Sequence, residues 1–161
     1  MVRWTPHSSD VARLIDECVD DPRRIEGIVV GCGPGSFTSI RIALATARGL
    51  GLGLGVPAAG ASTLDAFSGG MPVIDARRGE VFSPGPRVSR PDELDVSGKV
   101  LVGDGAVRYR ELFEAGGATI PDDPEAHRPD PRVLVAHAHA FGAAASLEPI
   151  YVREPDAKPA R

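Results

Sequence analysis

Residues 25–55 read IEGIVVGCGPGSFTSIRIALATARGLGLGLG, and this stretch decides the fold. The short apolar run at 25–30 is rich in β-branched residues, which predicts a buried strand. Glycines and a proline break the run at 31–35, and Ser36 is a suitable N-cap for a helix that begins at Phe37. We therefore predict a strand, a glycine turn and a helix, the repeating unit of an α/β fold.

The glycine turn matches neither common phosphate-binding motif. The stretch contains no lysine, which a P-loop requires, and Ser36 stands where the dinucleotide fingerprint has its third glycine. Backbone N–H groups at the start of a helix still attract anions. Gly33, Gly35 and Ser36 are thus a candidate anion-binding loop, and the alternative is a tight turn that only lets the backbone pack closely.

Small residues recur every four positions along the predicted helix, which places them on one face. They are Ala43, Ala47, Gly51 and Gly55. Because a glycine inside a helix costs about 0.8–1 kcal/mol relative to alanine, the glycines at 49, 51 and 53 suggest a close contact or an earlier helix end. The contacting segment could belong to this chain or to another protein.

Length and composition limit the class of protein. With 161 residues, the chain suits one compact domain or two small lobes. A net charge of −4 disfavours a dedicated nucleic-acid binder, which usually has a basic face. The sequence has no long apolar segment, no signal peptide and no cysteine framework, so we expect a soluble cytoplasmic protein without a membrane partner.

The rest of the chain divides into short elements. An amphipathic helix is predicted at 8–19, with its apolar face formed by Val11, Leu14, Ile15, Cys18 and Val19. Short strands are expected at 56–61, 73–75, 80–82 and 99–102, and an edge strand at 150–152. Helices are expected near 63–67, 107–113 and 132–146, loops at 83–91 and 121–131, and a mobile tail at 154–161. The break at 68–70 is the candidate lobe boundary.

Titratable side chains give one candidate chemical site. Asp75 and Asp104 both lie at ends of predicted strands, where they could hold Mg²⁺ or act as acid and base. The alternative is that Asp75 starts a turn and Asp104 caps a helix. His137 and His139 are two apart on a helix and cannot readily share a metal ion, and His127 is expected in an exposed loop without a partner. We predict no catalytic constellation and no metal site.

Several motifs resemble the TsaB (YeaZ) family and occur in the order typical of it. The first is Gly33-Pro34-Gly35-Ser36-Phe37-Thr38, continued by Arg41-Ile42 and Ala45-Thr46-Ala47. The others are Pro6-His7-Ser8, Ser62-Thr63-Leu64-Asp65-Ala66, Asp75-Ala76-Arg77-Arg78-Gly79-Glu80-Val81-Phe82, Gly103-Asp104-Gly105-Ala106 and Tyr151-Val152-Arg153-Glu154-Pro155-Asp156-Ala157-Lys158. Ser39 departs from the family, which usually has glycine there.

This resemblance implies an α/β, actin-like ATPase or RNase H-like fold with two lobes. The first, partner-binding lobe would cover 1–68 and be incomplete, since the family's usual first strands have no counterpart here. The second lobe would cover 71–149, followed by a C-terminal strand and tail at 150–161.

The resemblance also implies a function, in forming threonylcarbamoyladenosine on tRNA. We expect a non-catalytic subunit that pairs with a TsaD-like transferase, joins a TsaE-like ATPase, forms a homodimer in isolation and meets tRNA only indirectly. No cofactor is expected; the alternative is a nucleotide- or metal-binding enzyme that uses ATP and Mg²⁺. The expected partner-binding residues are Val11, Leu14, Ile15, Cys18, Ile40, Ala43, Leu44, Ala47 and Gly51.

Overall fold

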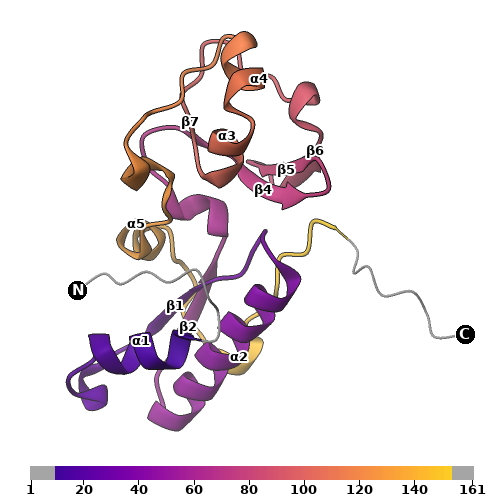
Figure 1. The fold of residues 1–161 in the computed structure, drawn as a ribbon. Coiled ribbons are helices and arrows are strands. Elements are labelled where there is room, and N and C mark those ends of the chain that lie inside the picture. Colours follow the sequence, from indigo (N-terminus) through magenta and orange to yellow (C-terminus); the bar gives the residue numbers. More distant parts are fainter. Residues whose placement is uncertain (1–9, 154–161) are drawn as a thin grey trace, which may run out of the picture.

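A computed structural model describes residues 10–153 of the chain, which form an α/β structure (Figure 1). The helices are α1 (Val11–Cys18), α2 (Phe37–Leu54), α3 (Asp104–Arg108), α4 (Arg110–Ala115) and α5 (Pro131–Ala136). The strands are β1 (Ile28–Gly31), β2 (Ala58–Ala61), β3 (Met71–Pro72), β4 (Ile74–Arg77), β5 (Glu80–Ser83), β6 (Arg87–Ser89) and β7 (Leu101–Val102). Short 3₁₀ turns, among them η3 (Thr63–Ala66) and η6 (Ala144–Ser146), connect them. The first two residues of the helix predicted at 8–19 and the predicted tail at 154–161 lie outside the described residues.

The stretch at 25–55 folds as predicted, with a strand that begins later. β1 and β2 are parallel, with Ile28 opposite Ala58, and α2 is the crossover between them. The backbone N–H of Ile40 donates to the carbonyl of Ser36, but the Ser36 side chain accepts no capping hydrogen bond, contrary to the prediction. Gly55 ends α2 with a φ of 68°, a conformation that glycine adopts without steric cost.

The second group of strands follows the break at 68–70. β3 pairs in parallel with β7, and β4, β5 and β6 form an antiparallel meander. β6 corrects the predicted loop at 83–91: Pro84-Gly85-Pro86 makes only the turn, and Val88 then pairs with Phe82. α3 and α4 replace the single helix expected at 107–113 and begin earlier, at Asp104.

The helix predicted at 132–146 is much shorter than expected. The Asp130 side chain caps the start of α5 by accepting the N–H of Arg132, but α5 ends at Ala136. Ala140 then has a φ of 56°, and Gly142 exchanges both backbone hydrogen bonds with Ala58 at the edge of β2. The chain therefore leaves the helix because its backbone completes a strand pair, and η6 follows that pair.

Two clusters hold most of the core. One joins β1, β2 and α2 to the segment after α5, through Val30, Leu44, Ala47, Ala144 and Leu147. The other joins β3, β5, β7 and helices α3 and α4 around Val73, Leu101 and Phe113. These element groups occupy the lower and upper parts of Figure 1. The segment 131–149, expected in the second lobe, contains α5 and η6, which contact η3, β1 and α2.

The edge strand predicted at 150–152 is absent. Ile150 donates its N–H to the carbonyl of Cys32, but residues 150–152 form no strand. No helix within the described part of the chain is long and apolar enough to cross a membrane.

Candidate functional site

The small-residue face predicted on α2 is in contact with this chain itself. Ile40, Leu44, Ala47 and Gly51 are buried, and η6 lies against them. A Cβ added to Gly51 would be 2.5 Å from the Cβ of Ala144. These four predicted partner-binding residues are thus core residues rather than a free surface, because the segment after α5 occupies the space that the spacing had indicated. Ala43 is half-buried against the same cluster.

The opposite face of α2 carries a second row of small residues at the same spacing, which is exposed. It consists of Ala45, Gly49 and Gly53, and a Cβ added at either glycine would meet nothing within 4 Å. Leu52 lies beside this row and its side chain is 85% exposed. The signal for this face was present in the sequence, since the glycines at 49 and 53 are also four residues apart.

Helix α1 has an incompletely covered apolar face. Val11, Leu14, Ile15 and Cys18 are all half-buried, and no residue of the helix is fully buried. Arg13, on the polar side, forms ion pairs with Asp10 and Glu17. The predicted amphipathic pattern is therefore present, and its apolar side still exposes area to solvent.

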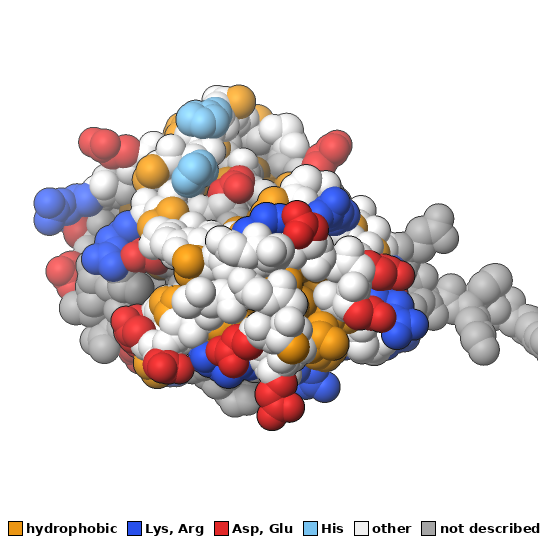
Figure 2. Space-filling view, turned by 90° about the horizontal axis from the view of Figure 1, so that it is seen from above, with side chains coloured by type: hydrophobic (Ala, Val, Ile, Leu, Met, Phe, Trp, Pro, Cys, Tyr) orange, Lys and Arg blue, Asp and Glu red, His pale blue; other side chains and the backbone are white. Residues whose placement is uncertain are grey.

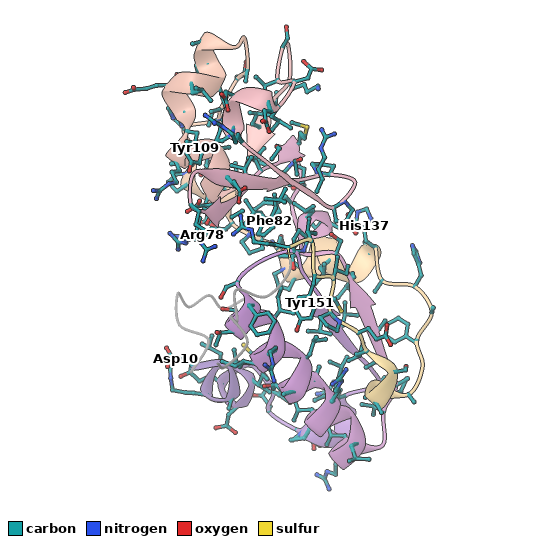
Figure 3. All side chains as sticks on the ribbon, turned by 90° about the vertical axis from the view of Figure 1, so that its right-hand side faces the viewer. Asp10, Arg78, Phe82, Tyr109, His137 and Tyr151 are labelled. Atoms are coloured by element: carbon teal, nitrogen blue, oxygen red, sulfur yellow. The ribbon has the colours of Figure 1, made fainter. Side chains whose placement is uncertain are left out.

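A cleft of about 840 Å³ brings together distant parts of the chain. Its walls come from four separate segments: the loop before α2 with the first turn of that helix, the β4–β5 hairpin, the start of α3 and the C-terminal segment. The polar and charged residues that line it include Ser36, Arg41, Asp75, Arg77, Arg78 and Arg153. Figure 3 labels Arg78 and Phe82 from the hairpin and Tyr151 from the C-terminal segment.

Asp75 is held firmly at the wall of this cleft. Its side chain is only 4% exposed, and it lies 3.1 Å from Nη1 of Arg77 and 3.7 Å from Nη1 of Arg108. Its Oδ1 accepts the backbone N–H of Arg77, and its own N–H donates to Oδ1 of Asp104 at 3.0 Å. A hydrogen bond to Tyr109 and the charge of Asp75 raise the pKa of Arg108.

The hairpin between β4 and β5 projects two arginines at the cleft. Arg77 and Arg78 have φ angles of 62° and 56°, and Gly79 follows with 78°. Positive φ is what the favoured two-residue hairpin turns require, but it is uncommon for residues other than glycine, asparagine and aspartate. This backbone places both arginines at the cleft, and Arg77 forms an ion pair with the Asp75 carboxylate.

The C-terminal segment forms the opposite rim. The ring of Tyr151 stacks on that of Phe37 at 5.2 Å between centroids, and Cζ of Arg41 lies 5.3 Å from the centroid of Phe37. Arg153 donates from Nη1 to the carbonyl of Ala76 at 3.1 Å and forms an ion pair with Glu80.

The structure brings the two predicted polar sites to one place. Gly35 and Ser36 of the candidate anion-binding loop line the same cleft as Asp75 and Asp104. Gly33 does not line it: its N–H donates to Oγ1 of Thr63, and a Cβ there would be 2.6 Å from the carbonyl oxygen of Ile150. Sequence reasoning did not bring the arginines of the cleft together in one site, because they meet only when distant segments fold against each other.

The histidines differ from expectation in two ways. His137 and His139 were expected on a helix, but they follow the end of α5 at Ala136. His127 has partners on both sides: its Nδ1 accepts the N–H of Gly103 at 3.2 Å, and its Nε2 lies 2.8 Å from the carbonyl of Pro121. The prediction that it lacked a partner is wrong, since the loop folds back on the turn after β7. Within residues 10–153, no three His, Cys, Asp or Glu side chains are grouped so as to hold a metal ion.

Charge elsewhere on the surface is mixed. Figure 2 shows acidic and basic side chains interspersed on the face seen from above, with small hydrophobic areas between them.

Comparisons with known proteins give consistent results. The family model described as TsaD, tRNA N6-adenosine threonylcarbamoyltransferase, matches residues 5–95. Uncharacterized proteins of Mycobacterium tuberculosis and Mycobacterium bovis are each 37% identical over 149 aligned positions, covering 84% of this chain and 67% of each relative. The tRNA threonylcarbamoyladenosine biosynthesis protein TsaB of Bacillus subtilis is 33% identical over 81 residues, covering 45% of this chain and 35% of that protein.

Two solved structures from Pseudomonas aeruginosa are similar in fold. One, described as an uncharacterized protein with similarity to peptidase YeaZ, has a TM-score of 0.69 at 24% identity, covering 89% of this chain and 81% of its own. The other, YeaZ, has a TM-score of 0.62 at 23% identity, with coverage of 89% and 82%. They show that the chain has a fold like that of YeaZ, and the predicted α/β class is confirmed.

Proposed function

Because the chain belongs to the TsaB (YeaZ) family, we propose that it acts in threonylcarbamoyladenosine formation on tRNA, as a non-catalytic subunit that pairs with a TsaD-like transferase. The observation that carries the pairing is the exposed row of Ala45, Gly49 and Gly53 on α2. We therefore place the contact with the transferase on the exposed face of α2, opposite the buried face for which it was predicted.

The two exposed glycines pack against no other segment in the described part of the chain. Each should destabilise α2 by about 0.8–1 kcal/mol relative to alanine, and the space around each is open. Small side chains allow a second helix to approach closely, and Leu52 beside them supplies an apolar anchor. The half-buried apolar face of α1 provides further area of the same character.

The same surface suits a second copy of the chain when the transferase is absent. Homodimer and heterodimer would then compete for α2, and a TsaE-like ATPase would join the assembled pair. The alternative function, a nucleotide- or metal-binding enzyme, would use the cleft. The Asp75 carboxylate would first have to give up its contacts with Arg77 and Arg108 to coordinate an ion.

The substitution Ala45→Arg tests the pairing. Position 45 is exposed, so an arginine there should leave the fold intact while its long charged side chain prevents a helix from packing on α2. We expect loss of co-elution with a TsaD-like subunit in size-exclusion chromatography. Ala47→Arg would be uninformative, because Ala47 is buried and the charge would disrupt the core.

Ala115→Arg is the matched control. It places the same side chain at an exposed position near the end of α4, away from α2. Both variants should melt near the wild-type temperature, and only the first should lose the partner. Undiminished co-elution of Ala45→Arg would show that the exposed face of α2 is not the interface.

A further inference from the structure

The cleft concentrates positive charge on a chain that is negative overall. Four arginines line it, at 41, 77, 78 and 153, against two carboxylates, Asp75 and Asp104, which leaves a local excess of two positive charges. The whole chain has a net charge of −4. Because arginine outnumbers acid here in particular, the cleft is suited to an anion, and planar guanidinium groups match phosphate oxygens best.

The acidic groups of the cleft are already engaged by neighbours. Of the two carboxylates that line it, Asp75 is paired with Arg77 and Arg108, and Asp104 accepts the N–H of Asp75. Glu80, which does not line the cleft, pairs with Arg153. These contacts reduce the repulsion that free carboxylates would exert on a phosphate. Arg41 contacts the Phe37 ring and forms no ion pair with any residue in the described part of the chain, so its charge remains available.

Two aromatic rings lie beside these charges and are open to solvent. Phe37 is 40% exposed and Tyr151 44% exposed. Arg41 covers part of Phe37, and Tyr151 stacks on the same ring. An aromatic ring next to guanidinium groups is the arrangement that proteins use to stack a nucleobase while holding its phosphate.

We propose that the mouth of this cleft binds a short single-stranded segment of RNA, with its phosphates on Arg41, Arg77 and Arg78 and a base stacked on Tyr151. The choice of RNA as the nucleic acid rests on the proposed function. It replaces the expectation that this subunit meets tRNA only indirectly.

The exposure of the side chains at the cleft favours an RNA strand over a free nucleotide as the ligand. A pocket for a small molecule buries most of its ligand and of the groups that recognise it. Here the Arg77 side chain is 78% exposed, and both aromatic rings lie partly in solvent. A strand that passes across an open cleft fits this arrangement, because its backbone continues beyond the contact on both sides.

The experiment measures fluorescence anisotropy of a labelled anticodon stem-loop RNA, titrated with the full chain at several salt concentrations. Arg77→Gln and Arg78→Gln should each weaken binding several-fold and reduce the salt slope by about one. Arg132→Gln is the matched control: Arg132 also follows its aspartate partner by two residues, and its side chain is 77% exposed, yet it lies on α5 outside the cleft. It should bind like the wild type.

Tyr151 gives a second, charge-independent measurement. Tyr151→Leu should weaken binding roughly tenfold, whereas Tyr151→Phe keeps the ring and should restore it. Circular dichroism of each variant checks that the fold is retained.

Three results would overturn the proposal. They are absence of RNA binding at low salt, equal effects of Arg77→Gln and Arg132→Gln, and displacement of the RNA by AMP or ATP at equal concentration, which would identify a mononucleotide pocket. The outcome is separable from the pairing, because Ala45→Arg should lose the transferase and still bind RNA. RNA binding without pairing would contradict only the proposed interface, and pairing without RNA binding would contradict only this cleft.

Discussion

Cys32 lies directly after β1, and its side chain is only 3% exposed. Burial raises the pKa of its thiol above the ordinary value of 9.0. In the unfolded chain the thiol ionises at that lower value, so alkaline solution favours unfolding. The stabilisation that the buried, neutral thiol contributes to the folded state is complete below about pH 9. It is lost as the pH rises through the higher pKa of the folded state.

We therefore expect the urea midpoint of unfolding to fall as the pH rises above about 9, and to fall less steeply in Cys32→Ala. Tyrosine and lysine ionisation affects both proteins alike, so the difference between the two pH profiles isolates Cys32. Parallel profiles would show that this thiol does not contribute to the alkaline loss of stability.

Individual residues were predictable where their role is local. Asp130 and Ser62 cap the elements that follow them, and each bonds to a backbone N–H two residues ahead, a pattern that a short window of sequence reveals. His127 was not predictable, because its partners, Gly103 and Pro121, depend on how a loop folds back. The same is true of Asp75, whose partner Arg108 is distant in sequence.

Helix α2 contains a matched pair of glycines that face opposite environments. Gly49→Ala adds a methyl group to open space and should stabilise the chain by about 1 kcal/mol through helix propensity. Gly51→Ala places the methyl 2.5 Å from the Cβ of Ala144 and should destabilise it by about 1–3 kcal/mol through overpacking. Thermal unfolding of the isolated chain measures both.

The same two variants also report on the proposed interface. Gly49→Ala should weaken pairing with the transferase although it stabilises the isolated chain, because the added methyl holds a second helix farther away. A stabilised variant that pairs as tightly as the wild type would contradict a close helix contact at Gly49. A stabilised Gly51→Ala variant would contradict the packing of η6 on α2.

Helices and strands were predicted well where a hydrophobic periodicity or turn-forming residues in the same segment mark them. The strand, turn and helix of 28–54 needed only residues close in sequence. The helix at 132–146 was overextended because its apolar spacing continues past Ala136, whereas the backbone of Gly142 bonds to Ala58. β6 was missed since two prolines around Gly85 suggested a loop, although they form only its turn.

At the scale of the whole molecule, the fold class followed from motifs and the assembled site did not. The glycine loop and the two aspartates were each found in the sequence, but that they share one cleft depends on how the α2 and β4–β5 regions lie against each other. The arginines at the cleft lie on three segments, and the first and last, Arg41 and Arg153, are more than a hundred residues apart along the chain. No periodicity or spacing rule joins residues so far apart.

The C-terminal segment physically links the two groups of elements, and Arg153 is the end of that link. The N–H of Ile150 donates to the carbonyl of Cys32, directly after β1, and the Tyr151 ring stacks on Phe37 of α2. Arg153 donates to the carbonyl of Ala76 in β4 and forms an ion pair with Glu80 in β5. Arg153→Ala should therefore lower the free energy of unfolding by about 1–2 kcal/mol, since a charge-assisted bond to a carbonyl and a half-buried ion pair are both lost. Urea unfolding measures this. Arg23→Ala, which removes an ion pair with Asp21 from a side chain that is 90% exposed, should change it far less. Equal losses in the two variants would mean that the link contributes no more than an ordinary surface pair, and that the two groups of elements are held together elsewhere.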